Sequence, residues 1–133
     1  MKILIAEDDF VSRKVLNNLL STLGEVDIAV NGQEAFIAVK TAIENNEPYE
    51  LICLDILMPE IDGIMTLKKI RQEEAQKGLD PEKRSKILMT SAVSDKKYVM
   101  AAIKANCDGF LVKPIDQARL FDEIRKHGFD IPE

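Results

Sequence analysis

Five short strand-like runs alternate along the chain with five longer segments of helical periodicity, and this alternation limits the available folds more than any other feature. The strand-like runs span Lys2 to Ala6, Glu25 to Ala29, Leu51 to Leu54, Lys86 to Thr90 and Gly109 to Val112. Short, nearly continuous apolar runs are typical of strands that are buried on both faces of a sheet. Strands that alternate with helices form βαβ units, in which helices cover both faces of a parallel sheet. We therefore predict a single α/β domain with five parallel strands and five helices.

The five intervening segments carry apolar residues at the three- and four-residue spacing of amphipathic helices. They span Phe10 to Leu23, Gln33 to Asn45, Ile64 to Gln76, Asp95 to Ala105 and Asp116 to His127. Gly24 is expected to stop the first of these helices, and Gly78 with Asp80-Pro81 is expected to stop the third. An acidic residue begins each of the last two segments, where it favours a helix N-terminus. We predict that the stretch from Arg71 to Lys86 is the least structured part of the chain, with its charges on a solvated surface.

Length and composition exclude several classes of protein. A chain of 133 residues is expected to form one domain, spanning residues 1–133. Its net charge of −5 disfavours nucleic acid as a direct partner. The sequence has no apolar stretch close to the roughly 18 residues that a membrane span needs. Its apolar start is too short for a signal peptide. We therefore expect a cytoplasmic protein without membrane insertion. Cys53 and Cys107 form no C-x-x-C motif and lack metal-ligand spacing, so we interpret both as reduced thiols.

Polar residues stand at the carboxyl ends of four of the five predicted strands. The first strand ends at Glu7-Asp8-Asp9, the third at Asp55, the fourth at Thr90-Ser91 and the fifth at Lys113-Pro114. Ligands of open parallel sheets bind beyond these ends. If the strands are neighbours, one pocket holds three or four carboxylates, a hydroxyl and an ammonium group. Carboxylates this close raise each other's pKa unless a cation lies between them, and a set of few carboxylates suits Mg²⁺.

A divalent cation, a lysine and a hydroxyl around one exposed aspartate form a site for phosphoryl transfer. The cation neutralises phosphoryl oxygens, Lys113 and the hydroxyl bind the others, and Asp55 acts as the nucleophile. Each residue alone has a simpler interpretation, with Asp9 as a helix cap and Asp55 or Ser91 as a turn residue. Because these residues occur together at four strand ends, we favour the phosphoryl-transfer site over the separate interpretations. No His or Cys is placed to bind zinc, and we interpret His127, the only histidine, as a surface cation at the end of the last helix.

Four motifs give the chain a close resemblance to the receiver domain of bacterial two-component response regulators. "ILIAEDD" resembles the family's first strand with its acidic pair, and "LDILMPEIDG" resembles the phosphorylation loop. "ILMTSA" resembles the fourth strand with its switch hydroxyl, and "GFLVKP" resembles the fifth strand with a switch aromatic residue and the active-site lysine. The resemblance covers nearly the whole chain and implies a doubly wound, flavodoxin-like sheet with strand order 2-1-3-4-5. It also implies a cis peptide bond between Lys113 and Pro114.

The resemblance implies roles for individual residues. Asp55 would be the phosphoacceptor. The Mg²⁺ site, in which Mn²⁺ can substitute, would consist of Glu7 (acting through water), Asp8, Asp55 and the backbone carbonyl of Leu57. The phosphoryl-binding and switch residues would be Ser91, Phe110 and Lys113. The acidic pair is placed at Glu7 and Asp8 because Arg13 then lies at the family's usual distance within the first helix. Ser91 is preferred to Thr90 because the family's hydroxyl directly precedes the alanine.

The resemblance also implies a function in signalling. A sensor histidine kinase or a phosphotransfer protein would donate a phosphoryl group to Asp55. Phosphorylation would then switch a protein-binding face, formed by the fourth helix, fifth strand and fifth helix, toward a downstream target. The protein would catalyse only its own phosphorylation and dephosphorylation. Because the sequence after Pro114 has room for one helix and a short tail from Gly128 to Glu133, we expect a stand-alone receiver similar to chemotaxis regulators.

Three other functions fit the sequence less well. A haloacid-dehalogenase-like phosphatase needs an acid two residues after its nucleophile, and Leu57 occupies that position. A nucleotide-binding module needs a glycine-rich loop after the first strand, and "AEDDFVS" has no glycine. A receiver that has lost phosphorylation would lack site residues that are present here. The chain departs from the family's usual pattern in the length of the segment from Arg71 to Lys86, and in the apolar residues Leu57 and Val93, where some members carry polar side chains.

Overall fold

Five parallel strands form one sheet in the order β2-β1-β3-β4-β5, as predicted. The computed structural model describes residues 1–58, 62–92 and 96–131. The strands are β1 (Lys2–Ala6), β2 (Glu25–Ala29), β3 (Leu51–Asp55), β4 (Lys86–Ser91) and β5 (Gly109–Val112). The helices are α1 (Phe10–Leu20), α2 (Gly32–Glu44), α3 (Gly63–Gln76), α4 (Lys96–Lys104) and α5 (Gln117–Lys126), with a short 3-10 helix η1 (Pro81–Lys83) before β4. No helix within these ranges is long and apolar enough to cross a membrane.

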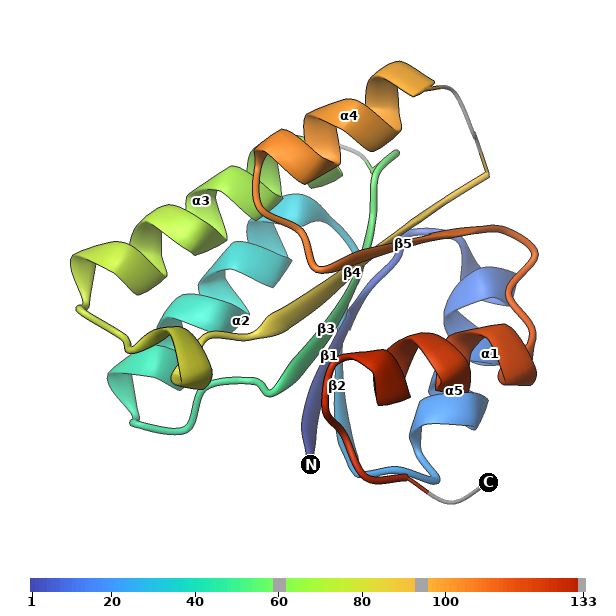
Figure 1. Cartoon of the computed structure of the whole chain (residues 1–133), viewed down its shortest axis with the longest axis horizontal. Helices are drawn as coiled ribbons and strands as arrows, with labels where there is room; N and C mark the ends of the chain where they lie inside the picture. The colour runs from blue at the N-terminus through green and yellow to red at the C-terminus, as the bar shows by residue number, and fades with distance from the viewer. Residues whose placement is uncertain (59–61, 93–95, 132–133) are drawn as a thin grey trace.

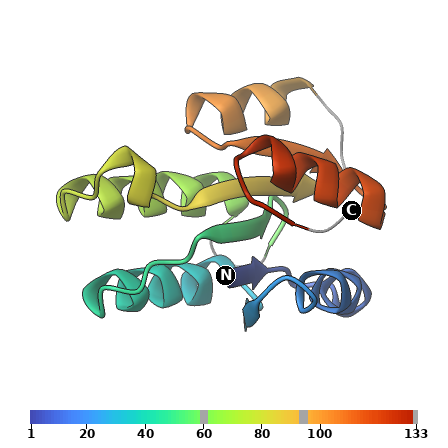
Figure 2. The ribbon, with the colours of Figure 1, turned by 60° about the horizontal axis from the view of Figure 1, so that its bottom comes forward.

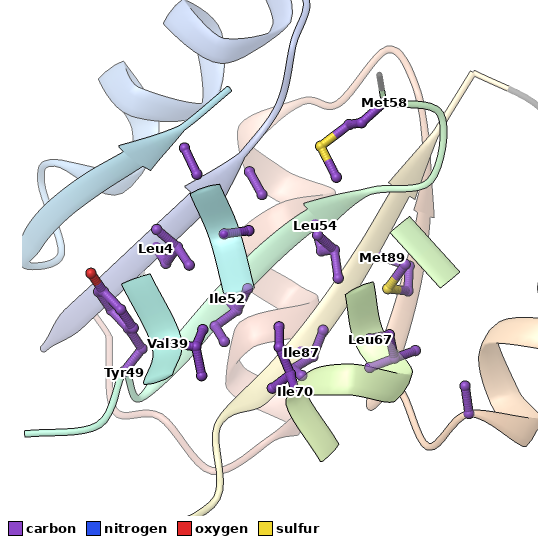
Figure 3. Packing of buried hydrophobic residues seen from close by; sticks show 14 of the residues in the cluster. Leu4, Val39, Tyr49, Ile52, Leu54, Met58, Leu67, Ile70, Ile87 and Met89 are labelled. Atoms are coloured by element: carbon purple, nitrogen blue, oxygen red, sulfur yellow. The ribbon is translucent and has the colours of Figure 1, made fainter. Parts of the chain in front are cut away.

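The helices lie in two layers, one on each face of the sheet (Figure 1 and Figure 2). α1 and α5 cover one face, while α2, α3 and α4 lie on the other. On the side of α2 and α3 (Figure 3), the strand residues in the core include Leu4, Ile52, Leu54, Ile87 and Met89. Under α1 and α5, the strand residues in the core include Ile3, Ile5, Leu51, Cys53 and Leu88. Successive residues of the central strands therefore face opposite cores, which explains why these strands are apolar throughout.

Side-chain caps fix the starts of four helices. Asp9, Asn31, Asp62 and Asp116 each accept a hydrogen bond from a backbone N–H in the first turn of α1, α2, α3 and α5. Such a cap typically contributes about 1 kcal/mol. Asp9 thus has the capping role that was its simpler interpretation. The predicted start of the fourth helix, Asp95, lies outside the described residues.

The end of the first helix differs from the prediction. α1 ends at Leu20, and Ser21 is its C-cap. Gly24 lies three residues further on, where an added Cβ atom would overlap the carbonyl oxygen of Met1. That carbonyl accepts a hydrogen bond of 2.8 Å from the N–H of Glu25. Gly24 therefore permits the close approach of the chain start to β2, and it does not stop the helix.

The segment from Arg71 to Lys86 is more ordered than predicted. The guanidinium group of Arg71 donates hydrogen bonds of 2.7 Å to the carboxylates of Glu74 and Asp108. It also donates to the carbonyl oxygens of Ser85 and Asn106. Glu74 is only 1% exposed, so the prediction of a solvated charged surface was wrong for this part of the segment. The predicted stop of the third helix is confirmed, because Gly78 follows the C-cap of α3 with a φ of 67°.

Candidate functional site

The carboxyl ends of β1, β3, β4 and β5 bring the predicted polar residues together. The side chain of Cys53 lies in the core under α1 and α5, and its strand neighbours on β1 and β4 belong to the same core. Two residues further along, on the same face, Asp55 of β3 pairs with Thr90 of β4. Glu7 directly follows the last residue of β1, next to this pair. Lys113 follows β5 on the same side and reaches across to Asp55 and Glu7.

Lys113 balances part of the charge of two buried acids. Its Nζ lies 2.5 Å from Oε1 of Glu7 and 3.4 Å from Oδ2 of Asp55. Glu7 is 0% exposed and Asp55 is 4% exposed. Burial, followed by the hydrogen bond and charge of Glu7, raises the pKa of Asp55 to about 7, although Lys113 opposes the shift. Burial alone would lower the pKa of Lys113, but the two carboxyl groups raise it.

The acidic residues can hold a divalent cation. Carboxylate oxygens of Glu7, Asp8 and Asp55 all lie within 4.8 Å of one another. Lys113 pairs with two of these three carboxylates, Glu7 and Asp55, which leaves an excess of negative charge that a hard cation would neutralise. Asp9 does not join this set, because its carboxylate accepts a hydrogen bond of 2.9 Å from the N–H of Ser12, which lowers its pKa. The donor set, made of oxygen alone, fits Mg²⁺.

Asp55→Asn is expected to raise the free energy of unfolding of the metal-free protein by about 1–3 kcal/mol at about pH 8. The pKa of Asp55 is raised in the folded state, so the folded chain holds an extra proton between about pH 4 and pH 7. Stability therefore falls as the pH rises through that window, and asparagine removes this loss. Urea unfolding in a chelator at several pH values measures the difference, which should nearly vanish at about pH 4. A variant less stable than the wild type at the higher pH would contradict the expectation.

The two adjacent hydroxyl residues of β4 face opposite sides of the sheet. Thr90 lies on the side of Asp55, as described above. Ser91 lies on the side of Met89, in the direction of α3 and α4, and it is 0% exposed. Phe110 is half-buried and packs against the core on that same side. Ser91 is the hydroxyl residue that the sequence favours, and only the strand register shows that Thr90 is the neighbour of Asp55.

The peptide bond between Lys113 and Pro114 is cis, as the resemblance implies. The bond directly follows β5, at the position from which the lysine side chain crosses the strand ends. Cys53 and Cys107 are both free thiols, as interpreted from the sequence. His127 is half-buried at the C-cap of α5. Among the described residues, the cluster of Glu7, Asp8 and Asp55 is the only group of potential metal ligands.

The loop after Asp55 packs tightly against the start of α3. An added Cβ atom at Gly63 would overlap the carbonyl oxygen of Asp55, and the N–H of Gly63 donates a hydrogen bond of 2.7 Å to the carbonyl of Ile56. The close approach of Gly63 to the strand end is visible only in the fold. Leu57 is 49% exposed, and the metal contact of its carbonyl stays a prediction. Val93 lies outside the described residues.

Known proteins share both the sequence and the fold. The family described as response regulator receiver domain matches residues 3–125. The chain is 32% identical over 125 residues to the chemotaxis protein CheY of Bacillus subtilis, covering 94% of this chain and 95% of that protein. It is 33% identical over 122 residues to the osmosensing histidine protein kinase SLN1 of Saccharomyces cerevisiae, covering 90% of this chain but 9% of the kinase. The similarity to such kinases thus spans a small part of their length.

Two solved structures are similar over most of their length. A chain of the CheX-CheY-BeF3-Mg²⁺ complex from Borrelia burgdorferi has a TM-score of 0.82 at 26% identity, with 98% of this chain and 90% of that chain covered. The receiver domain of the histidine kinase CKI1 from Arabidopsis thaliana, complexed with Mg²⁺ and BeF3⁻, has a TM-score of 0.81 at 30% identity, with 94% and 87% covered. The match along residues 3–125 and the shared fold agree with the geometry of the strand ends. The chain therefore belongs to the family of response regulator receiver domains.

Proposed function

We propose that this receiver domain accepts a phosphoryl group on Asp55 from a sensor histidine kinase or a phosphotransfer protein, with Mg²⁺ bound beside it. The observation that carries the proposal is the position of Asp55 at a strand end, between the acidic residues of β1 and Lys113. The solved relatives from Borrelia burgdorferi and Arabidopsis thaliana, which contain Mg²⁺ and BeF3⁻, support it.

Each residue of the site has a distinct role in the phosphoryl transfer. A carboxylate oxygen of Asp55 forms a bond to phosphorus while the P–N bond of the donor's phosphohistidine breaks, and the imidazole leaves with the bonding electrons and takes a proton. Glu7, Asp8, Asp55 and the carbonyl of Leu57 would hold Mg²⁺, which when bound neutralises phosphoryl oxygens. Lys113, whose Nζ lies between two carboxylates, can donate to a phosphoryl oxygen and stabilise its charge.

Phosphorylation with a small donor tests the proposal. Acetyl phosphate with Mg²⁺ is expected to add the mass of one phosphoryl group to the intact protein. Asp55→Asn should abolish the addition, while the matched change Asp9→Asn, in the helix cap, should leave it in place. The mass spectrum of the intact protein is the measurement. Phosphorylation of the Asp55→Asn variant at the wild-type level would refute the assignment.

We expect Mg²⁺ to bind in the millimolar to sub-millimolar range, because the site offers few protein ligands and leaves the remaining coordination positions to water. Asp8→Ala should weaken binding most among single changes to Asp8 and Asp9. Asp8 belongs to the carboxylate cluster, whereas Asp9 is engaged by the N–H of Ser12. Titration calorimetry measures both affinities. If Asp8→Ala binds Mg²⁺ with wild-type affinity while Asp9→Ala binds it more weakly, the acidic pair would have to be reassigned by one residue.

We further propose that Ser91 and Phe110 connect the site to an output face on α4, β5 and α5. Both residues lie toward the side of the sheet on which α4 packs. On α4, Ala102 is buried while Met100 and Ile103 are 48% and 56% exposed, so apolar surface remains available to a target protein. Ser91 would move toward the phosphoryl group and Phe110 would turn inward, which shifts the balance between two packings of this face.

The proposed output face predicts where the spectrum of the protein changes. Phosphorylation should shift amide resonances mainly between Ser91 and Gln117, because the site acts through β4 and β5. Two-dimensional NMR of the labelled protein, with and without acetyl phosphate, measures the shifts. Changes confined to α2 and α3 would place the output elsewhere.

The domain, spanning residues 1–133, acts as a signalling module rather than a metabolic enzyme. We propose that its catalysis is limited to its own phosphorylation and dephosphorylation. We also propose that it works in the cytoplasm through protein partners, without direct contact with nucleic acid. A phosphorylated donor kinase that transfers its phosphoryl group to this chain would identify the first partner.

A further inference from the structure

Thr90 carries a buried hydroxyl group that the proposed chemistry does not yet use. Its side chain is 0% exposed, and its Oγ1 makes no hydrogen bond with any residue in the ranges 1–58, 62–92 and 96–131. A buried hydroxyl without a partner lowers stability, because it has given up its hydrogen bonds to water. Valine has nearly the same shape and no such cost, so the hydroxyl does not serve the folded state described here.

The surroundings of Thr90 restrict what its hydroxyl can bind. The strand register places Asp55 of β3 on one side of Thr90 and Leu111 of β5 on the other. Leu111 has no polar side-chain atom, and the carbonyl of Thr90 itself already accepts a hydrogen bond of 3.0 Å from the N–H of Ile56. The adjacent side-chain acceptor in this row is therefore the carboxyl group of Asp55.

The side chain of Lys113 crosses the strand ends next to Thr90. It follows β5, yet its ammonium group reaches Asp55 on β3 and Glu7 at the end of β1. Its side chain must therefore pass over the end of β4, where Thr90 lies. In the state described here the ammonium group is close to Oδ2 of Asp55, so that oxygen already has a donor.

We propose that Thr90 is a positioning residue whose hydroxyl donates to Asp55 once that residue carries the phosphoryl group. The proposal rests on Asp55 being the phosphoacceptor, as proposed above. When one carboxyl oxygen binds phosphorus, the other becomes the carbonyl oxygen of an acyl phosphate, and Lys113 can turn to the phosphoryl oxygens. A rotation about χ1 of Thr90 to another staggered rotamer moves its hydroxyl group and can bring it to that carbonyl. The hydrogen bond then fixes the plane of the acyl group and stabilises the phosphorylated state.

This role differs from that of Ser91, because the two hydroxyl groups lie on opposite faces of β4. Ser91 is expected to contact the phosphoryl group itself. Thr90 acts on the acyl group of Asp55 and so influences the phosphoryl group only through its attachment. Loss of either hydroxyl should weaken the phosphorylated state, but only loss of the Thr90 hydroxyl should alter the carbonyl of Asp55.

Thr90→Val and Thr90→Ser test the proposal, with beryllofluoride as the probe for the phosphoryl group at saturating Mg²⁺. Thr90→Val is expected to weaken beryllofluoride binding about fivefold, the scale of one net hydrogen bond, while Thr90→Ser stays close to the wild type. The affinity for Mg²⁺ alone should not change. The ¹³Cγ resonance of Asp55 in the beryllofluoride complex should shift in Thr90→Val but not in Thr90→Ser, a readout that a purely structural role would not move.

Stability without the probe supplies the matched control. Thr90→Val should unfold at the same urea concentration as the wild type or a higher one, because no hydrogen bond is lost. Thr66→Val makes the same change at a fully buried threonine whose hydroxyl donates to the carbonyl of Asp62 at 2.9 Å, and it should unfold at a lower concentration.

Two results would overturn the role of Thr90 alone. One is wild-type affinity for beryllofluoride in Thr90→Val, and the other is a clear loss of stability in Thr90→Val without the probe, which would show that the hydroxyl is already bonded. A wild-type protein that neither binds beryllofluoride nor becomes phosphorylated on Asp55 would instead overturn the proposed function, and the role of Thr90 with it.

Discussion

Replacing Lys113 with methionine is expected to lower the free energy of unfolding of the metal-free protein by about 3–5 kcal/mol at neutral pH. Methionine keeps the unbranched shape of the side chain but removes the ammonium group that lies 2.5 Å from Glu7 and 3.4 Å from Asp55. Both acids are almost completely buried, so the change leaves two carboxyl groups without their cation. The loss should be smaller at about pH 5, where one of the two carboxyl groups can bind a proton instead.

Urea unfolding in a chelator, at both pH values, measures the effect of Lys113→Met. The matched control is Lys126→Met, because Lys126 pairs with Glu123 at 3.4 Å but its side chain is 72% exposed. An exposed pair of this kind contributes at most about 1 kcal/mol. Equal losses in the two variants would show that the charge of Lys113 does not support the buried acids.

Replacing Arg71 with methionine is expected to cost a similar amount, about 3–5 kcal/mol, far from the phosphorylation site. The guanidinium group of Arg71 is bound by two carboxylates and two carbonyl oxygens. Glu74 would remain as a buried carboxylate that keeps its hydrogen bond of 2.8 Å from the N–H of Ser85. Asp108 would keep its hydrogen bond from the N–H of Ile87 but lose its ion pair.

A second change separates the charge of Glu74 from the packing of Arg71. Adding Glu74→Gln to Arg71→Met should recover part of the lost stability, because the buried carboxylate is then gone. Urea unfolding of the two single variants and the double variant gives the coupling energy. A value for Arg71→Met within about 0.5 kcal/mol of the wild type would show that these contacts do not stabilise the fold.

The fold was largely predictable because its central strands are buried on both faces. Such strands produce apolar runs that stand out from the helical segments between them, and β3 and β4 end only one residue later than predicted, at Asp55 and Ser91. The predicted helix ends were less accurate. Leu23 is not helical, because Gly24 is required for the close approach of Met1 rather than for a helix cap.

The site was predictable to the extent that it depends on strand ends. Glu7, Asp8, Asp55 and Lys113 lie at the ends of their strands or directly after them, so the fold class alone brings them to one edge of the sheet. The face on which each residue lies depends on strand register, which the sequence does not show. For this reason the neighbour of Asp55 on β4 was not recognised as Thr90.

The contacts of Arg71 were not predictable, because they are made between distant parts of the chain. Its partners Ser85, Asn106 and Asp108 follow it by 14, 35 and 37 residues. A sequence shows spacing within one helix or strand, but it does not show which loops meet at the far edge of the sheet. A charged segment that looks solvated in the sequence can therefore hold buried ion pairs.

Mapping the phosphorylated residue tests the central claim most directly. Sodium borohydride reduces an aspartyl phosphate to homoserine with release of phosphate, and peptide mass spectrometry then locates the change. After incubation with acetyl phosphate and Mg²⁺, homoserine is expected at position 55 and at no other acidic residue, and not without Mg²⁺. Homoserine at a different aspartate, with Asp55 intact, would contradict the assignment of this site.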